Sequence, residues 1–283
     1  MAMDEQRLGR RLQAARVQAG LTQQALCQKA QLSYSTLTKI ERGAIKSPSI
    51  FTIQSIASAL NVGLDALMGG ATTPRSLKQR SKTGISFVYF DINGCLVRFF
   101  HAAFARLSED TGASPDAVES VFWHYNDMVC QGTLTLAEFN RQLSIELHAK
   151  EQLDWMHYYM ETIEPIPAMH ELVHWAAQHY RIGLLSNIMP GFIDVMLKKG
   201  LLPKADYDAI VDSSVVKFIK PESKMYTVAA EKAGVPDNEI LLIDDSRVNL
   251  MAAEKHDWHV LWFDDYRPDE SVKRVKQALE PAE

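Results

Sequence analysis

The chain has few cysteines, no long apolar run and, in its first part, few acidic residues. Its three cysteines, Cys27, Cys95 and Cys130, are widely and unevenly spaced, which argues against a disulfide framework or a zinc site. No stretch approaches the roughly 20 apolar residues that span a bilayer. The N-terminal residues MAMDEQRLGRR lack the apolar core of a signal peptide. These absences predict a protein of the reducing cytoplasm without a membrane partner.

Charge is distributed unevenly along the 283 residues. Residues 1–70 contain eight Lys or Arg and four Asp or Glu, and residues 71–84 add four Lys or Arg and no acid. Because the whole chain carries −5, residues 85–283 carry −13. A basic first part fits a phosphate backbone as partner, whereas the acidic remainder does not. Length and charge together predict two domains with different partners.

The apolar periodicity changes type near residue 85. Over residues 5–68 apolar residues recur at helical spacing, and no strand-like alternation appears. Later runs have the composition of buried strands and alternate with helical patterns; they are ISFVYF, RIGLLS, YDAIV, EILLID and WHVLWF. We therefore expect an all-α domain at 1–70, an exposed basic linker at 71–84, and an α/β domain with a parallel sheet at 85–283.

The segment GLTQQALCQKAQLSYSTLTKIERG, residues 20–43, predicts two short helices joined by a tight turn. Thr22 and Ser33 are favourable N-cap residues for these two helices. Together with LGRRLQAAR before it and PSIFTIQSIASALNV after it, the segment resembles the helix-turn-helix domains of the phage-repressor/Cro (XRE) type. The resemblance extends over residues 5–68.

That resemblance implies binding to double-stranded DNA, with the second helix in the major groove. Gln23, at the start of the first helix, would bind a phosphate oxygen. Alternatively, Lys39 is a solvated surface charge without a role in binding. The whole module could also be a helical bundle that contacts proteins instead of DNA. The family usually binds two-fold sites, so a homodimer is expected. The residues that would face bases or nearby phosphates are Tyr34, Ser35, Thr36 and Lys39.

Polar residues with complementary chemistry follow the predicted strands of the second domain. The carboxyl ends of parallel strands meet at one edge of a sheet, where open α/β sheets place their ligands. A carboxylate nucleophile, further carboxylates for Mg²⁺, a hydroxyl and an ammonium suit phosphoryl chemistry. Two lysines, Lys217 and Lys220, could supply the ammonium. Pro221 and Glu222, which follow Lys220, favour Lys220. The candidate residues are Asp91, Ser186, Lys220, Asp244 and Asp245.

In order and spacing, these motifs resemble the haloacid dehalogenase (HAD) superfamily over about residues 85–265. The resemblance implies a Rossmann-like core, and a helical cap at 98–164 that closes over the site and selects substrates. It also implies an aspartyl-phosphate mechanism on Asp91 and a phosphorylated small molecule as ligand. The implied Mg²⁺ ligands are Asp91, Asp244, Asp245 and the main-chain carbonyl of Asn93.

The sequence departs from the family pattern beside the nucleophile. Phosphatases of the family typically read Asp-x-Asp-Gly-Thr, whereas this chain reads Asp91-Ile92-Asn93-Gly94-Cys95. The second Asp normally protonates the leaving alcohol and later activates water, and an asparagine cannot transfer a proton. Loss of such a general acid/base lowers a rate by about 10²–10⁴-fold. Some members of the family lack this Asp and remain active.

Three functions therefore remain open from the sequence. The preferred one is a transcription regulator whose HAD-like domain senses a phosphorylated small molecule with little turnover. The second is a working phosphatase attached to an autoregulatory DNA-binding domain. The third is a regulator that stores a phosphoryl group on Asp91 as a switch. Trp123, Tyr125 and Trp155 are expected in the core of the cap, although one of them could line its pocket.

Overall fold

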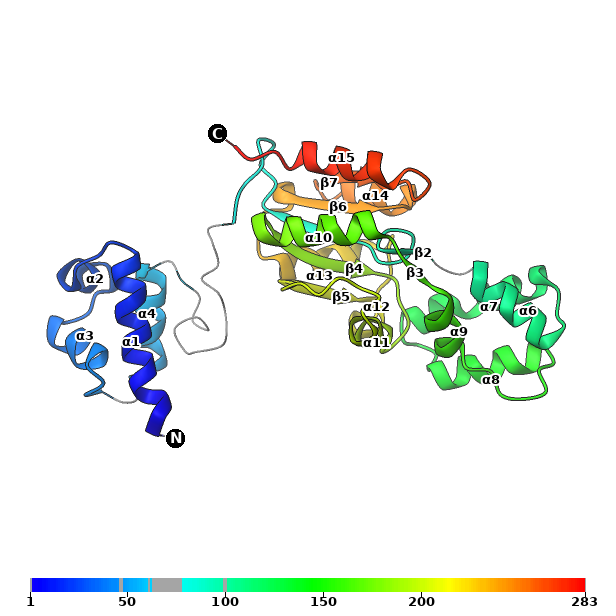
Figure 1. Cartoon of the computed structure of the whole chain (residues 1–283), viewed down its shortest axis with the longest axis horizontal. Coiled ribbons are helices and arrows are strands. Elements are labelled where there is room, and N and C mark those ends of the chain that lie inside the picture. Colours follow the sequence, from blue (N-terminus) through cyan, green and yellow to red (C-terminus); the bar gives the residue numbers. More distant parts are fainter. Residues whose placement is uncertain (1, 46–47, 61, 63–77, 99–100, 283) are drawn as a thin grey trace. The chain divides into compact units, whose positions relative to one another are not determined.

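The computed structural model describes the chain except for residues 1, 46–47, 61, 63–77, 99–100 and 283 (Figure 1). Two compact units are present, Met1–Leu77 and Lys78–Glu283, and each is described by itself. Residues 71–77 of the expected linker lie outside the described residues. No helix in the described part of the chain is long and apolar enough to cross a membrane.

In the described residues of the first unit, all regular secondary structure is helical. Its helices are α1 (Ala2–Gln18), α2 (Gln23–Ala30), α3 (Tyr34–Glu41) and α4 (Ile50–Leu60). Thr22 Oγ1 accepts a hydrogen bond from the backbone N–H of Ala25, and Ser33 Oγ accepts one from Thr36, both at 3.1 Å. Both predicted N-caps are therefore confirmed. Between α2 and α3 the chain turns at Gln31, which has a left-handed φ of 52°.

An apolar core holds these helices together. Each helix contributes fully buried side chains, among them Leu12, Leu26, Leu37 and Ile56. Complete burial of such a side chain contributes about 1.5–3 kcal/mol. These residues belong to the helical stripes seen in the sequence, so the prediction of an all-α first domain is confirmed.

The second unit contains a five-stranded parallel sheet with the order β5-β4-β1-β6-β7. The strands are β1 (Phe87–Phe90), β4 (Arg181–Ser186), β5 (Ala209–Asp212), β6 (Ile240–Asp244) and β7 (His259–Trp262). Each overlaps one of the five apolar runs predicted as strands, so the α/β fold class is confirmed. The order of the strands reverses between β1 and β6, and ligands of open α/β sheets bind beyond the carboxyl ends at such a switch point.

Helices cover both faces of this sheet (Figure 1). Val88 and Phe90 pack against one group of helices, whereas Phe87 and Tyr89 pack against the other, as alternation along a strand requires. The first group is α10 (Pro167–His179), α11 (Phe192–Lys199) and α15 (Pro268–Ala278). The second group is α13 (Ser223–Ala233) and α14 (Arg247–Glu254). Short turns of helix occur at α12 (Ser213–Val216) and η1 (Asp237–Glu239).

The insertion after the first strand is helical, as expected for residues 98–164. Its described helices are α6 (His101–Thr111), α7 (Pro115–Cys130), α8 (Leu136–Glu146) and α9 (Trp155–Thr162). Figure 1 shows them gathered at one end of the sheet. At the base of this cap, β2 (Val97–Arg98) pairs antiparallel with β3 (Glu164–Pro165). The sequence did not indicate this pair, because two-residue strands are too short to show alternation.

The second half of the expected linker is part of the second unit. Ser81 forms an isolated bridge with Pro281, and the backbone N–H of Lys82 donates to the carbonyl of Glu280 at 2.8 Å. The N–H of Gln79 donates to the carbonyl of His179 at 2.7 Å. Residues 78–84 are thus fixed by main-chain hydrogen bonds. Composition could not reveal this, because the partners lie about 100 and 200 residues away in the sequence.

Candidate active site and nucleic-acid interface

Asp91 lies immediately beyond β1, at the carboxyl edge of the sheet. Its backbone N–H continues the ladder to β6 by donating to the carbonyl of Ile243 at 3.0 Å. Its carboxylate Oδ1 accepts the N–H of Ile92 at 2.7 Å, which fixes the side chain, and the residue is only 6% exposed. The strand therefore delivers a buried, oriented carboxylate to the switch point.

Lys220 joins this carboxylate to that of β6. Its Nζ lies 2.9 Å from Asp91 Oδ1 and 2.6 Å from Asp244 Oδ2. The side chain of Asn187 holds the main chain of Lys220, since Oδ1 accepts its N–H at 2.7 Å and Nδ2 donates to its carbonyl at 2.8 Å. Lys217 is exposed instead, and its Nζ lies 3.4 Å from the carbonyl of Gly132. Of the two lysines considered, only Lys220 lies in the site.

The two adjacent acids at the end of β6 have different surroundings. Asp244 is fully buried and accepts hydrogen bonds from the backbone of Ser246 at 2.8 Å and from Asn249 Nδ2 at 3.1 and 3.2 Å. Asp245 is exposed and lies against Gly94, where a Cβ would come within 2.1 Å of Asp245 Oδ2. A side chain at position 94, which also has a φ of +80°, would displace that carboxylate.

Excess negative charge characterises the site. Oxygen atoms of Asp91, Asp244 and Asp245 lie within 4.8 Å of one another, and the ammonium of Lys220 forms ion pairs with two of them, Asp91 and Asp244. Burial raises the pKa of Asp91 to about 7, with Lys220 opposing this shift and the other two carboxylates adding to it. Burial alone lowers the pKa of Lys220, but Asp244 and Asp91 raise it above its ordinary value, so its ammonium stays charged.

Asn93 connects the carboxyl edge of the sheet to the cap. Its Oδ1 accepts a hydrogen bond from the phenol of Tyr159, and its Nδ2 lies 3.5 Å from the carbonyl of Asn187. Burial and the charge of Asp91 raise the pKa of Tyr159, so that the phenol stays protonated. The amide of Asn93 has no proton that it can transfer, so this side chain cannot act as a general acid/base.

Ser186 ends β4 at the same edge as Asp91. Its hydroxyl is completely buried and has no hydrogen-bond partner among the described residues. An unpaired buried hydroxyl is uncommon, because its desolvation is not compensated. Lys220 lines the cavity between the sheet and the cap, whereas the side chain of Ser186 does not.

A cavity of about 310 Å³ lies between the carboxyl edge of the sheet and the cap. Sequence reasoning allowed one of Trp123, Tyr125 and Trp155 to line it, and the structure places both tryptophans there. The contributions of Asn126, Asp127 and Tyr159 were missed, because they depend on how the cap docks on the core. On the core side the lining includes Asp91, Asn93, Asn187, Lys220, Asp245 and Asn249.

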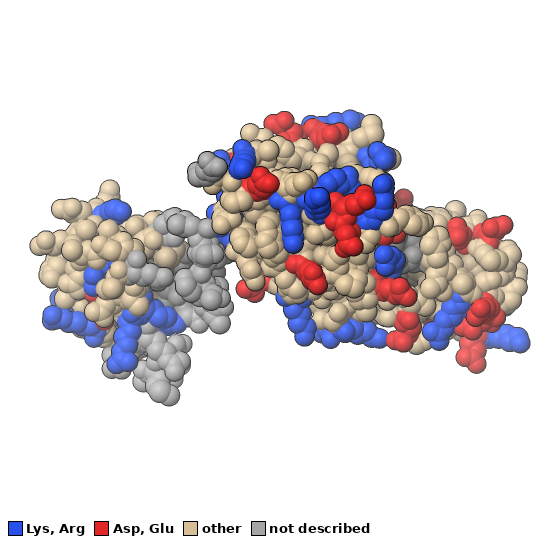
Figure 2. Space-filling model, turned by 45° about the horizontal axis from the view of Figure 1, so that its top comes forward, with Lys and Arg blue, Asp and Glu red and all other residues tan. Residues whose placement is uncertain are grey.

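The candidate DNA-contacting residues lie on α3 and at the start of α2. Tyr34, Ser35 and Lys39 are exposed, and Thr36 is partly buried. Gln23, which is expected to bind a phosphate oxygen, has two hydrogen bonds within the unit: its Nε2 donates to Glu41 Oε2 at 2.6 Å and its Oε1 accepts from Tyr34 at 2.9 Å. On the face of this unit shown in Figure 2, basic side chains predominate, whereas the second unit displays both signs.

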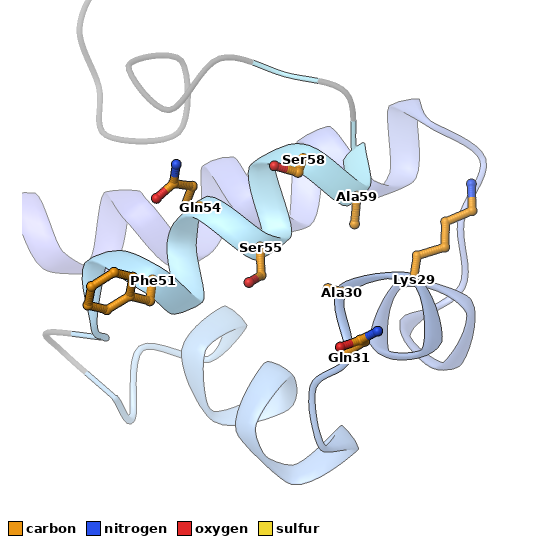
Figure 3. A pocket seen from close by; sticks show the side chains of 8 residues that line it. All are labelled: Lys29, Ala30, Gln31, Phe51, Gln54, Ser55, Ser58 and Ala59. Atoms are coloured by element: carbon orange, nitrogen blue, oxygen red, sulfur yellow. The ribbon is translucent and has the colours of Figure 1, made fainter.

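A hollow of about 460 Å³ on the first unit lies between α2 and α4 (Figure 3). Lys29 is the one charged residue in its lining, and Phe51 contributes a ring that is 76% exposed. The remaining lining is Ala30, Gln31, Gln54, Ser55, Ser58 and Ala59. Its residues are not among those expected to contact DNA.

Comparison with known proteins gives matches for both units. The helix-turn-helix family matches residues 12–67, and the family of haloacid dehalogenase-like hydrolases matches residues 85–257. An immunity repressor of Bacillus phage phi105 is 40% identical over 65 residues, which are 23% of this chain and 44% of the repressor. An (S)-2-haloacid dehalogenase 4A from Burkholderia cepacia is 26% identical over 183 residues, covering 59% of this chain and 77% of the relative.

Among solved structures, a HAD family enzyme from Bacteroides thetaiotaomicron in complex with magnesium and inorganic phosphate superposes with a TM-score of 0.55. The two are 18% identical, and the match covers 64% of this chain and 96% of that one. This likeness shows a shared fold. The chain belongs to the haloacid dehalogenase-like hydrolases and carries, ahead of that domain, a helix-turn-helix DNA-binding domain.

Proposed function

We propose that the chain is a DNA-binding transcription regulator whose second unit binds a phosphorylated small molecule at Asp91, Lys220, Asp244 and Asp245. The supporting observation is Asn93, held by Tyr159 at the position where proton transfer would be needed. The carboxylates and the ammonium that would bind a phosphate and its metal ion are present, whereas the aspartate that speeds turnover in the family is replaced by Asn93. We take residues 1–70 as the DNA-binding part and the second unit, which begins at Lys78, as the sensor with its cap at 98–164. Of the connection expected at 71–84, residues 78–84 belong to that second unit.

The residues of the site fit a bound Mg²⁺. Their donors are carboxylate oxygens, which this ion prefers, and three come within 4.8 Å of one another. Without added positive charge, the surplus of carboxylates over ammonium groups would repel a phosphate. Asp91, Asp244, Asp245 and the carbonyl of Asn93 would hold the ion, which supplies that positive charge when bound. Lys220 supplies a further charge, and the buried hydroxyl of Ser186 is a donor that has no hydrogen-bond partner among the described residues.

Dimerisation is part of this proposal. Helix-turn-helix proteins of this kind bind two half-sites about one helical turn of DNA apart. A ligand changes DNA affinity only by its difference in affinity for two states of the protein. Cap closure that alters the pairing of two second units would provide such states without requiring a rigid connection between the units.

Operator binding with and without ligand tests the proposal. The full chain first selects its operator from random DNA, and anisotropy then measures affinity in Mg²⁺ with a panel of phosphomonoesters. At least one compound is expected to change operator affinity about 5–150-fold, the usual range of coupling between sites. Asp91→Asn should remove this response. The proposal fails if no phosphomonoester changes operator affinity, or if the Asp91→Asn variant responds like its parent.

A phosphatase is the second candidate, because nucleophile and ammonium are in contact at 2.9 Å. If the parent hydrolyses p-nitrophenyl phosphate slowly, Asn93→Asp is expected to raise the steady rate of phosphate release by about 10²-fold or more. The variant restores a carboxyl group where the family places its general acid/base. A parent that is already fast would contradict the importance given to Asn93. Asn93→Ala, which adds no acid, is the control.

A further inference from the structure

The cap side of the cavity differs chemically from its catalytic side. Helix α7 presents Trp123, Asn126, Asp127 and Cys130 to the cavity, at the i, i+3, i+4 and i+7 spacing of one helical face. Trp123 and Asp127 are both exposed, so they stand where the cavity meets solvent. The part of a ligand farthest from the phosphate would therefore meet an indole and a carboxylate.

Asp127 has no counter-charge in the described structure. It forms no ion pair with any described residue, and its Oδ1 accepts only the neutral amide of Asn126, at 3.1 Å. Among the described residues that line the cavity, Lys220 is the one cation, and it is held between Asp91 and Asp244. A second anionic group on the ligand would meet a carboxylate and no cation.

Aromatic rings form the wall beside Asp127. The ring of Phe122 lies edge-on to Trp123, with centroids 5.0 Å apart, and packs against Trp155 at 4.6 Å. Trp155 is 1% exposed and therefore fixed, whereas Trp123 is 50% exposed and presents ring surface. Indole faces attract organic cations within about 6 Å, and quaternary ammonium groups are often bound in this way.

On the basis of the proposed function, we propose that this site takes phosphomonoesters whose alcohol part carries a positively charged ammonium group. Asp127 supplies the counter-charge, and Trp123 and Trp155 supply aromatic walls. The cation also offsets the surplus of negative charge in the cavity. A volume of about 310 Å³ restricts the alcohol to a compact one, since ligand cavities range up to about 1,000 Å³. Bisphosphates and phosphorylated carboxylic acids are excluded by charge.

A neutral isostere tests the charge directly. Calorimetry on the full chain in Mg²⁺ compares phosphocholine and phosphoethanolamine with 3,3-dimethylbutyl phosphate, which has the shape of phosphocholine without its charge. Phosphocholine, phosphoethanolamine or both are expected to bind at least about tenfold more tightly than the isostere. Equal affinities for the isostere and both ammonium esters would overturn the proposal. So would tighter binding of glycerol phosphate or a hexose phosphate, because hydroxyl groups would then be the recognised feature.

Variants assign the preference to its residues. Asp127→Asn is expected to reduce the ratio of ammonium-ester to isostere affinity by about tenfold, and Trp123→Leu by a smaller factor. Glu109→Gln removes an exposed carboxylate elsewhere on the cap and should keep the parental ratio. An unchanged ratio in Asp127→Asn would overturn the role of that residue.

The same titrations separate this inference from the proposed function. If the isostere binds as well as the ammonium esters, only the inference fails and a phosphate-binding site remains. If neither orthophosphate nor any phosphomonoester binds in Mg²⁺, the proposed function fails and the inference with it.

Discussion

Lys220→Met is expected to destabilise the second unit by about 3–5 kcal/mol, the usual cost of removing one partner from a buried ion pair. The substitution leaves Asp91 and Asp244, which are 6% and 0% exposed, without their common cation. In a unit of this size the melting temperature should fall by roughly 10 °C. Tryptophan fluorescence in EDTA follows this unit alone, because all five tryptophans lie beyond residue 120.

Lys217→Met is the matched control for that experiment. It removes the same charge three residues earlier, from an exposed side chain whose single described hydrogen bond is long, at 3.4 Å. Exposed charges contribute about 0–1 kcal/mol, so this variant should melt within a few degrees of the parent. If the Lys220→Met and Lys217→Met variants have the same melting temperature, the ion pairs of Lys220 with Asp91 and Asp244 do not stabilise the edge of the sheet.

The sequence could predict which acids meet at the carboxyl edge of the sheet because a general rule relates the end of an apolar strand pattern to that edge. Asp91 and Asp244 follow or end apolar runs, and parallel strands bring such positions together whatever the loops do. Lys220 lies in a connection rather than at a strand end, so strand pattern alone could not separate it from Lys217. Lys220 enters the site because the side chain of Asn187, 33 residues away, forms two hydrogen bonds with the main chain of Lys220.

Side-chain contacts between different helices and strands could not be predicted from the sequence for a related reason. Tyr159 reaches Asn93 across 66 residues because α9 returns the chain from the cap to the edge of the sheet. Helical periodicity predicts that α9 exists but not the direction in which it docks. Gln23 illustrates the same limit, since its position at a helix start predicts a phosphate contact but does not reveal its hydrogen bonds with Glu41 and Tyr34 of α3. The phosphate contact itself stays a prediction.

Glu41→Ala is expected to unfold the first unit or leave it marginally folded. Arg16 and Glu41 form a two-bond ion pair, with Nε to Oε1 at 2.7 Å and Nη2 to Oε2 at 3.2 Å, and both residues are less than 10% exposed. Losing the carboxylate leaves a buried guanidinium uncompensated, which costs about 3–5 kcal/mol. A single core of this size rarely supplies more than about 3–5 kcal/mol in total.

Hydrogen exchange on the full chain measures this effect separately for each unit. Amides of α1 to α4 should lose most of their protection in Glu41→Ala, whereas those of the five-stranded sheet should keep theirs. Operator binding should fall by more than about 100-fold, since Gln23, the acceptor of the Tyr34 hydroxyl, also loses its hydrogen bond to Glu41. Arg42→Ala, which changes the adjacent exposed residue, should retain exchange protection. Full protection of α1 to α4 in Glu41→Ala would show that apolar packing alone holds the helix-turn-helix, and the side chains proposed to contact DNA would then owe their arrangement to that packing.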